Sequence, residues 1–134
     1  GAAARASLKD LDSQTTIAAR RDMLAGGLRA ATPDLVVIGG GAMRLANTLC
    51  VALPGQAAET LVIRLDLAGV AISAGSACSS GKVGASAALS AMGLGDDLAK
   101  GAVRLSLGPE TTDDDIRRAV TAWREITVGA RRAA

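Results

Sequence analysis

Four short apolar runs, each bounded by glycine, proline or polar residues, interrupt segments that are rich in helix-forming residues. Short runs of valine, isoleucine and leucine are typical of strands, whereas the segments between them have apolar residues at helical spacing. The expected strands are residues 35–38, 48–53, 70–72 and 103–107. This order predicts an α+β fold, a small mixed sheet on which helices pack.

The helical segments differ in how clearly their ends are marked. The expected helices cover residues 2–31, 57–67 and 85–92, with a turn at 96–100. The first has an apolar stripe from Leu8 to Leu28 and can break near Asp12. The last begins at Thr111 or Thr112, where a hydroxyl can cap free N–H groups ahead of three aspartates, and Gly129 is expected to end it.

Composition excludes several classes of function. The 134 residues suffice for one domain with a hydrophobic core. The absence of histidine excludes an imidazole base, a histidine metal ligand and a Ser-His-Asp triad within this chain. Two cysteines argue against a zinc cluster or a disulfide framework. A net charge of +2 and a single aromatic residue argue against a nucleic-acid partner.

The sequence also lacks the marks of membrane association. No stretch approaches the ~18 apolar residues that a membrane-spanning helix requires. Residues 1–5 lack the apolar region of a signal peptide and do not begin with methionine, which suggests a part of a longer protein. We expect no membrane contact and a cytoplasmic location in which both thiols are reduced.

Cys78 is the strongest candidate for chemistry. It lies in residues 73–81, whose other members are all glycine, alanine or serine and cannot bury a thiol. We expect a mobile loop that another molecule can approach, and the charge of Lys82 could favour the thiolate. On the residues alone, a reactive thiol and an inert exposed thiol are equally compatible with this segment.

Two residues inside expected strands, Cys50 and Arg104, could have either a structural or a functional role. Cys50 lies in an apolar run where a small buried hydrophobe fits, so we predict a packing role. Arg104 interrupts another apolar run, and its charge requires either a solvated strand face or a carboxylate that its planar fork can clamp. Arg44 and Asn47 stand at a strand entrance, where structural roles are commoner than catalytic ones.

Several motifs occur in an order that resembles a known family. They are residues 44–49, 68–81, 91–94, 103–108 and 111–116. Together they resemble the C-terminal part of a cysteine desulfurase of the NifS/IscS type, in the class V group of pyridoxal-phosphate (PLP) aminotransferase-fold enzymes. Gly-Ser-Ala-Cys-Ser-Ser-Gly at 75–81 is the most specific element. The resemblance implies that residues 1–134 are a single small C-terminal domain of a fold-type I PLP-dependent transferase.

The same resemblance implies an activity and its residues. Cys78 would take sulfur from L-cysteine, leaving L-alanine and a Cys78 persulfide, and Arg104 would bind the substrate α-carboxylate. A homodimer is implied, together with an iron–sulfur scaffold or another sulfur acceptor, and Cys78 could be a transient iron–sulfur ligand shared with the scaffold. The family's Schiff-base lysine, stacking histidine and ring-nitrogen aspartate belong to a preceding large domain. We therefore expect PLP to bind outside this chain, which alone would be inactive.

Two other functions remain open at this point. One is a non-enzymatic thiol module that accepts or relays sulfur. The other is a class V member of the selenocysteine lyase kind, because sulfur and selenium preference cannot be read from this segment. Cys50 is a departure from the resemblance, since it stands where the family usually has asparagine or serine.

Overall fold

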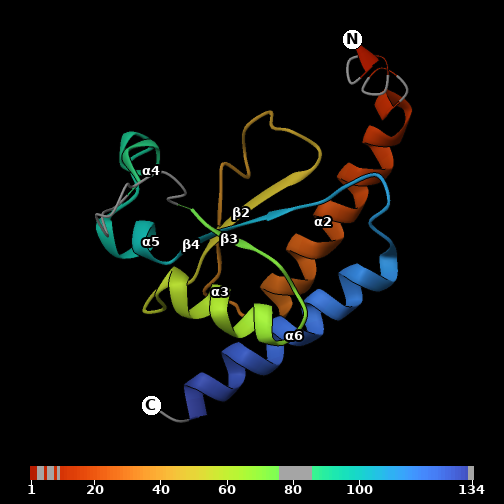
Figure 1. Ribbon diagram of the computed structural model, residues 1–134. Coiled ribbons are helices and arrows are strands. Elements are labelled where there is room, and N and C mark those ends of the chain that lie inside the picture. The colour runs from red at the N-terminus through yellow and green to blue at the C-terminus, as the bar shows by residue number, and fades with distance from the viewer. Residues whose placement is uncertain (3–4, 6–7, 9, 76–85, 133–134) are drawn as a thin grey trace.

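The computed structural model describes residues 1–2, 5, 8, 10–75 and 86–132. The helices are η1 (Asp10–Ser13, a 3-10 helix), α2 (Gln14–Ala31), α3 (Ala58–Leu67), α4 (Ala87–Ala91), α5 (Asp96–Lys100) and α6 (Asp113–Arg132). The strands are β1 (Val36–Ile38), β2 (Thr48–Ala52), β3 (Ser73–Ala74) and β4 (Ala102–Ser106). The expected α+β class is confirmed (Figure 1).

The sheet has the strand order β1-β2-β4-β3, and all three described pairings are antiparallel. This corrects the expectation of a mixed sheet. The expected strand at residues 70–72 is also wrong, because β3 begins only at Ser73. Val70 instead donates its N–H to the carbonyl oxygen of Leu65 at 2.8 Å, after Gly69 turns the chain with a φ of 77°. This pattern closes the end of α3.

The helix boundaries confirm one expectation and correct two. The interruption near Asp12 is confirmed, since η1 precedes α2. Residues 96–100 form the short helix α5 rather than a turn. Helix α6 continues through Gly129 to Arg132, because Gly129 does not adopt the left-handed backbone that would end a helix there.

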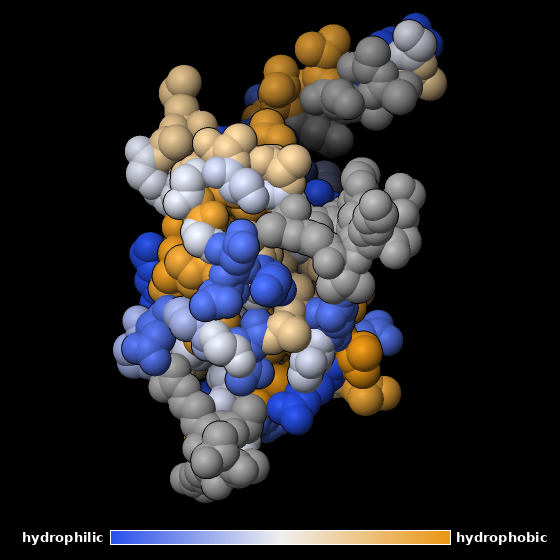
Figure 2. Space-filling model, turned by 90° about the vertical axis from the view of Figure 1, so that its left-hand side faces the viewer, coloured by the Kyte–Doolittle hydropathy of each residue, from blue (hydrophilic) through white to orange (hydrophobic). Residues whose placement is uncertain are grey.

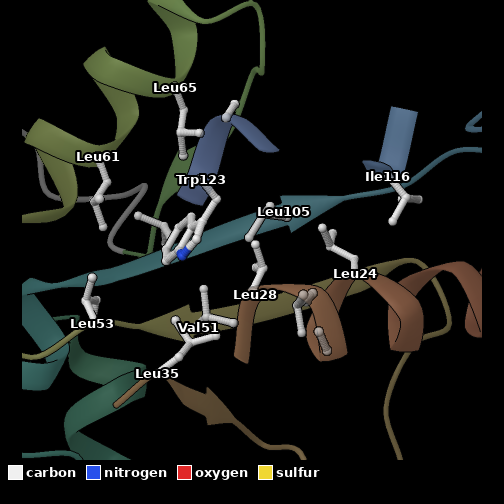
Figure 3. Packing of buried hydrophobic residues seen from close by; sticks show 14 of the residues in the cluster. Leu24, Leu28, Leu35, Val51, Leu53, Leu61, Leu65, Leu105, Ile116 and Trp123 are labelled. Carbon is white, nitrogen blue, oxygen red and sulfur yellow. The ribbon is translucent and has the colours of Figure 1, made fainter. Parts of the chain in front are cut away.

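Helices α2, α3 and α6 cover one face of the sheet, and α4 and α5 lie on the opposite side (Figure 1). The main core fills the space between the three longer helices and the sheet. Trp123 of α6 is 1% exposed and belongs to the same buried cluster as Leu61 and Leu65 of α3 and Leu105 of β4, all labelled in Figure 3. This core consists of aliphatic side chains packed around one indole. Its close packing holds the sheet in a fixed position, so the residues on the opposite face of the sheet are also held in place.

The N-terminal end lies apart from this core. It projects from the body of the molecule, and hydrophobic atoms lie exposed on it (Figure 2). Leu8 and Leu11 are 68% and 60% exposed, whereas Leu24 and Leu28 of α2 are buried. The expected apolar stripe therefore packs only from α2 onward. Within the described part of the chain, no helix combines the length and the hydropathy needed to cross a bilayer.

The first turn of α6 is capped by Thr112, as the sequence predicts, and Asp115 makes the cap reciprocal. The Thr112 hydroxyl accepts the Asp115 N–H at 3.2 Å, and the Asp115 carboxylate accepts the Thr112 N–H at 2.9 Å. We expect Thr112→Val to lower the free energy of unfolding by about 1 kcal/mol, as measured by urea denaturation. Thr121→Val, at an exposed position of the same helix, is the control and should have almost no effect.

This cap also predicts a pH dependence. The hydrogen bonds from Thr112 hold the pKa of Asp115 below its ordinary value. A carboxyl group whose pKa is lowered by folding stabilises the protein above its unfolded pKa of about 4, and this contribution is lost as pH falls through the lowered value. Below about pH 4, the unfolding free energy of the wild type should therefore fall more steeply than that of Thr112→Val. Parallel slopes would contradict the assignment.

Candidate functional site

The two faces of the sheet differ in what covers them. Side chains alternate along a strand, so neighbouring residues point to opposite faces. The residues that point toward α2, α3 and α6 are buried: Leu49, Val51, Val103 and Leu105. The residues on the second face that remain half-buried or exposed are Thr48, Cys50, Arg104 and Ser106. Polar and reactive groups therefore gather on the face that the three longer helices leave open.

Helices α4 and α5 cover only one end of this second face. They contribute Leu89 and Ala99 to a small apolar cluster with Ile38, Ala52 and Ala102 of the sheet. The cluster ends at Cys50, which is partly buried against it. Beyond Cys50, the described residues of the face are open to solvent.

Arg104 lies in the middle of a row of residues that crosses the whole sheet. Its position on β4 is in register with Cys50 on β2 and with Ser73 on β3, and Cys50 is in turn opposite Ile38 on β1. Directly opposed residues of antiparallel strands have Cβ atoms about 4.5–5.5 Å apart and point to the same face. A guanidinium therefore lies between a thiol and a hydroxyl that are far from it in the sequence.

The environment of Arg104 is that of an available cation. The side chain is exposed, and no hydrogen bond or ion pair within the described residues engages its guanidinium. The strand face is therefore solvated, one of the two readings that the sequence left open. The planar guanidinium of an arginine on such a face can also donate two parallel hydrogen bonds to a carboxylate.

Cys50 does not have the purely internal position that its apolar strand predicts. It is half-buried, and it lines a shallow hollow of about 330 Å³ together with Ile38, Met43 and Met92. Burial raises the pKa of the Cys50 thiol, and the positive charge of Arg104 opposes this rise. The alternation of side chains along each strand is a sequence signal that could have predicted solvated positions for Cys50 and Arg104. Their juxtaposition depends on the register, which neither strand specifies by itself.

Arg44 and Asn47 have the structural surroundings expected at a strand entrance. An Arg44 Nη2 atom lies 3.6 Å from the carboxylate of Asp22 on α2. Asn47 accepts a hydrogen bond from the Thr48 hydroxyl at 3.1 Å, and its carbonyl accepts the Leu107 N–H at 2.8 Å. These contacts fasten the chain ahead of β2 and beside the end of β4.

Cys78 and Lys82 lie outside the described residues, so their expected roles and the expected mobility of their loop stay predictions. The chain leading toward them is described as far as Gly75. Gly75 donates its N–H to the carbonyl oxygen of Ala102 at 2.6 Å. This bond extends the β3–β4 pairing by one residue and holds the chain at the edge strand, next to Ser73 and Arg104.

Gly75 has no room for a side chain. A Cβ atom there would lie 2.9 Å from the Ala102 Cβ and 3.0 Å from its carbonyl oxygen. We expect Gly75→Ala to push β3 from β4 and to lower the free energy of unfolding by about 2 kcal/mol, measured by urea denaturation. Gly41→Ala is the matched control, because a Cβ at Gly41 meets nothing within 4 Å. Equal effects of the two substitutions would contradict this prediction.

The sheet residues of the open face do not fit PLP. A PLP site requires a lysine for the Schiff base and a partner for the ring nitrogen, usually an acidic side chain. The polar side chains offered by this part of the sheet are Ser73, Thr48, Cys50, Arg104 and Ser106, among which there is neither a lysine nor a carboxylate. These described sheet residues could therefore contribute to a shared site, but none of them could hold this cofactor covalently.

Comparison with known proteins reveals extensive similarity over this chain. The family model for aminotransferase class-V matches residues 6–119. A cysteine desulfurase from Azospirillum brasilense is 36% identical over 120 residues, which are 90% of this chain and 30% of that protein. A cysteine desulfurase from Cereibacter sphaeroides is 41% identical over 98 residues, 73% of this chain and 25% of the relative. The chain thus spans about 30% of the length of curated relatives such as the first.

Solved structures agree with the fold. A NifS-like protein from Rickettsia africae superposes with a TM-score of 0.75 at 27% identity, over 86% of this chain and 29% of that protein. Another structure, of a protein described as NifS-like, has a TM-score of 0.77 over 91% of this chain and 30% of its own. Its identity of 24% makes it evidence of the fold alone.

Proposed function

The chain belongs to the class-V aminotransferase family, and from this we propose that it is the small C-terminal domain, residues 1–134, of a cysteine desulfurase. Arg104 would bind the carboxylate of L-cysteine, and Cys78 would receive its sulfur. The observation that carries the proposal is the exposed guanidinium of Arg104, which has no hydrogen-bond or ion-pair partner among the described residues and lies in register with Ser73 at the start of the Cys78 segment. Cys78 follows Ser73 by five residues, a span of at most about 17 Å.

The proposed reaction conserves atoms and electrons without an external oxidant. The thiolate of Cys78 forms a bond to the substrate sulfur while the substrate carbon–sulfur bond breaks. The electron pair of that bond goes to the substrate carbon, which takes a proton, so L-cysteine becomes L-alanine. Cys78 then carries the persulfide, which a second acceptor can remove.

The proposed function also implies a cofactor, an oligomeric state, a location and a partner protein. PLP would be bound by the part of the full-length enzyme that the chain does not span, in keeping with the lack of a lysine among the described sheet residues of the open face. We propose a homodimer and a cytoplasmic location, where free thiols persist. We also propose an iron–sulfur scaffold, or another sulfur-accepting protein, as the partner that unloads Cys78, with Cys78 as a transient shared ligand.

A sulfur-relay module is the second candidate, because the described sheet residues of the open face include no lysine for PLP. In that case Cys78 would accept sulfur from a persulfide made by another protein. The two candidates differ in the sulfur donor that they need. A selenocysteine lyase activity differs from both in preferring selenocysteine when the two amino acids compete.

The test is to mix the chain with the PLP-bound large domain of a cysteine desulfurase and supply L-cysteine. Peptide mass spectrometry should detect one added sulfur atom on Cys78, together with L-alanine in equal amount. Cys78→Ser should abolish the addition, and Cys50 should carry no added sulfur. Sulfur on Cys78 only from a ready-made persulfide donor would support the relay module instead.

A further inference from the structure

We propose that Cys50 is a specificity-determining residue of the Arg104 site, placed beside the carboxylate that Arg104 binds. The inference rests on the proposed function, because it assumes that a small carboxylic acid binds to Arg104. It assigns to Cys50 a part that its apolar strand does not suggest: the side chain would form the wall against which the rest of that small molecule packs.

The first step is geometric. Cys50 and Arg104 are directly opposed residues of β2 and β4, so their side chains leave the sheet side by side on the open face. Burial raises the pKa of the Cys50 thiol, and the positive charge of Arg104 opposes this rise. A carboxylate held by the guanidinium would therefore come within reach of the sulfur atom.

The hollow beside Cys50 indicates the chemical class of ligand that would fit there. Cys50 borders the hollow of about 330 Å³ whose other lining residues include Ile38, Met43 and Met92. Among the described residues that line it, Arg44 is the only charged one, and none is a carboxylate. Arg104 lies outside this lining, so Cys50 is the residue that borders both the hollow and Arg104. A small carboxylic acid whose other end is apolar or sulfur-bearing can thus place its charge on Arg104 and its remainder against Cys50.

Alkylation of Cys50 tests the proposal directly in the full chain. In the Cys78→Ser background, Cys50 is the only thiol, because the sequence has two cysteines. Its alkylation rates with iodoacetate and with the neutral reagent iodoacetamide can be followed by intact mass. The ratio of the two rates cancels any change in the thiolate fraction. We expect Arg104→Gln to lower the iodoacetate-to-iodoacetamide ratio about fivefold, the effect of one charge at about 4 Å in water.

Two control variants separate a specific site from a general positive field. Arg104→Lys should retain most of the ratio, because it keeps a positive charge at the same place. Arg44→Gln removes a charge from the rim of the hollow and should leave the ratio within about twofold of the parent value. An unchanged ratio in Arg104→Gln would overturn the proposal, and so would an equal loss in Arg44→Gln.

Failure of the Cys50 proposal can be distinguished from failure of the proposed desulfurase function. Absence of sulfur on Cys78 in the reconstitution experiment would remove the desulfurase proposal, whatever the alkylation ratio. An unaltered alkylation ratio combined with sulfur on Cys78 would leave the desulfurase in place and exclude Cys50 from its substrate site.

Discussion

Trp123→Ala is expected to lower the free energy of unfolding by about 4 kcal/mol, measured by urea denaturation. The indole is 1% exposed and lies between α3 and the sheet (Figure 3), so its removal leaves a cavity that rigid neighbours cannot fill. The substitution also removes the hydrogen bond that the indole N–H donates to the Thr32 hydroxyl at 3.0 Å. A loss below about 2 kcal/mol would contradict the central position of this side chain.

Trp123→Phe separates packing from hydrogen bonding. Phenylalanine keeps most of the apolar volume but cannot donate to Thr32, whose hydroxyl retains a contact with the Thr127 hydroxyl at 3.3 Å. We expect Trp123→Phe to cost about 1–2 kcal/mol, clearly less than alanine. Equal losses for the two variants would show that the hydrogen bond, rather than the packed volume, stabilises this region.

Arg104→Ala is expected to lower kcat/KM for L-cysteine by roughly 150-fold, or about 3 kcal/mol, in the enzyme reconstituted with a PLP-bound large domain. The physical reason is that the substrate carboxylate loses its charge-assisted, two-point contact. Because Arg104 is exposed and no hydrogen bond or ion pair among the described residues engages its guanidinium, stability should change little. The measurement is therefore a kinetic assay of alanine release accompanied by a denaturation curve.

Two further variants sharpen this result. Arg104→Lys keeps the charge but not the planar fork, so it should recover only part of the activity. Ser106→Ala alters the same face two residues further along β4 and should leave kcat/KM nearly unchanged. An Arg104→Ala enzyme with wild-type kcat/KM would show that the carboxylate binds elsewhere.

The local signals were sufficient for the elements whose ends have chemical marks. The threonine cap and three aspartates located the start of α6, which begins at Asp113. Where a mark was ambiguous, the prediction failed. Gly129 can end a helix or continue it, and here α6 continues to Arg132 because neighbouring turns retain helical geometry. Residues 70–72 favour a strand by composition, but the end of α3 determines their conformation.

The motif around Cys78, the apolar strands and the α+β class are properties of the sequence by itself, because each depends on residues that are close together in the chain. What only the tertiary structure decided is the row that places Arg104 between Cys50 and Ser73. Three strands from distant segments meet there, and their register is set by the packing of the opposite face against α2, α3 and α6. The sequence of a single strand does not specify which strands pair with it or in which register. It can therefore suggest a solvated position for a guanidinium, but not which groups surround it.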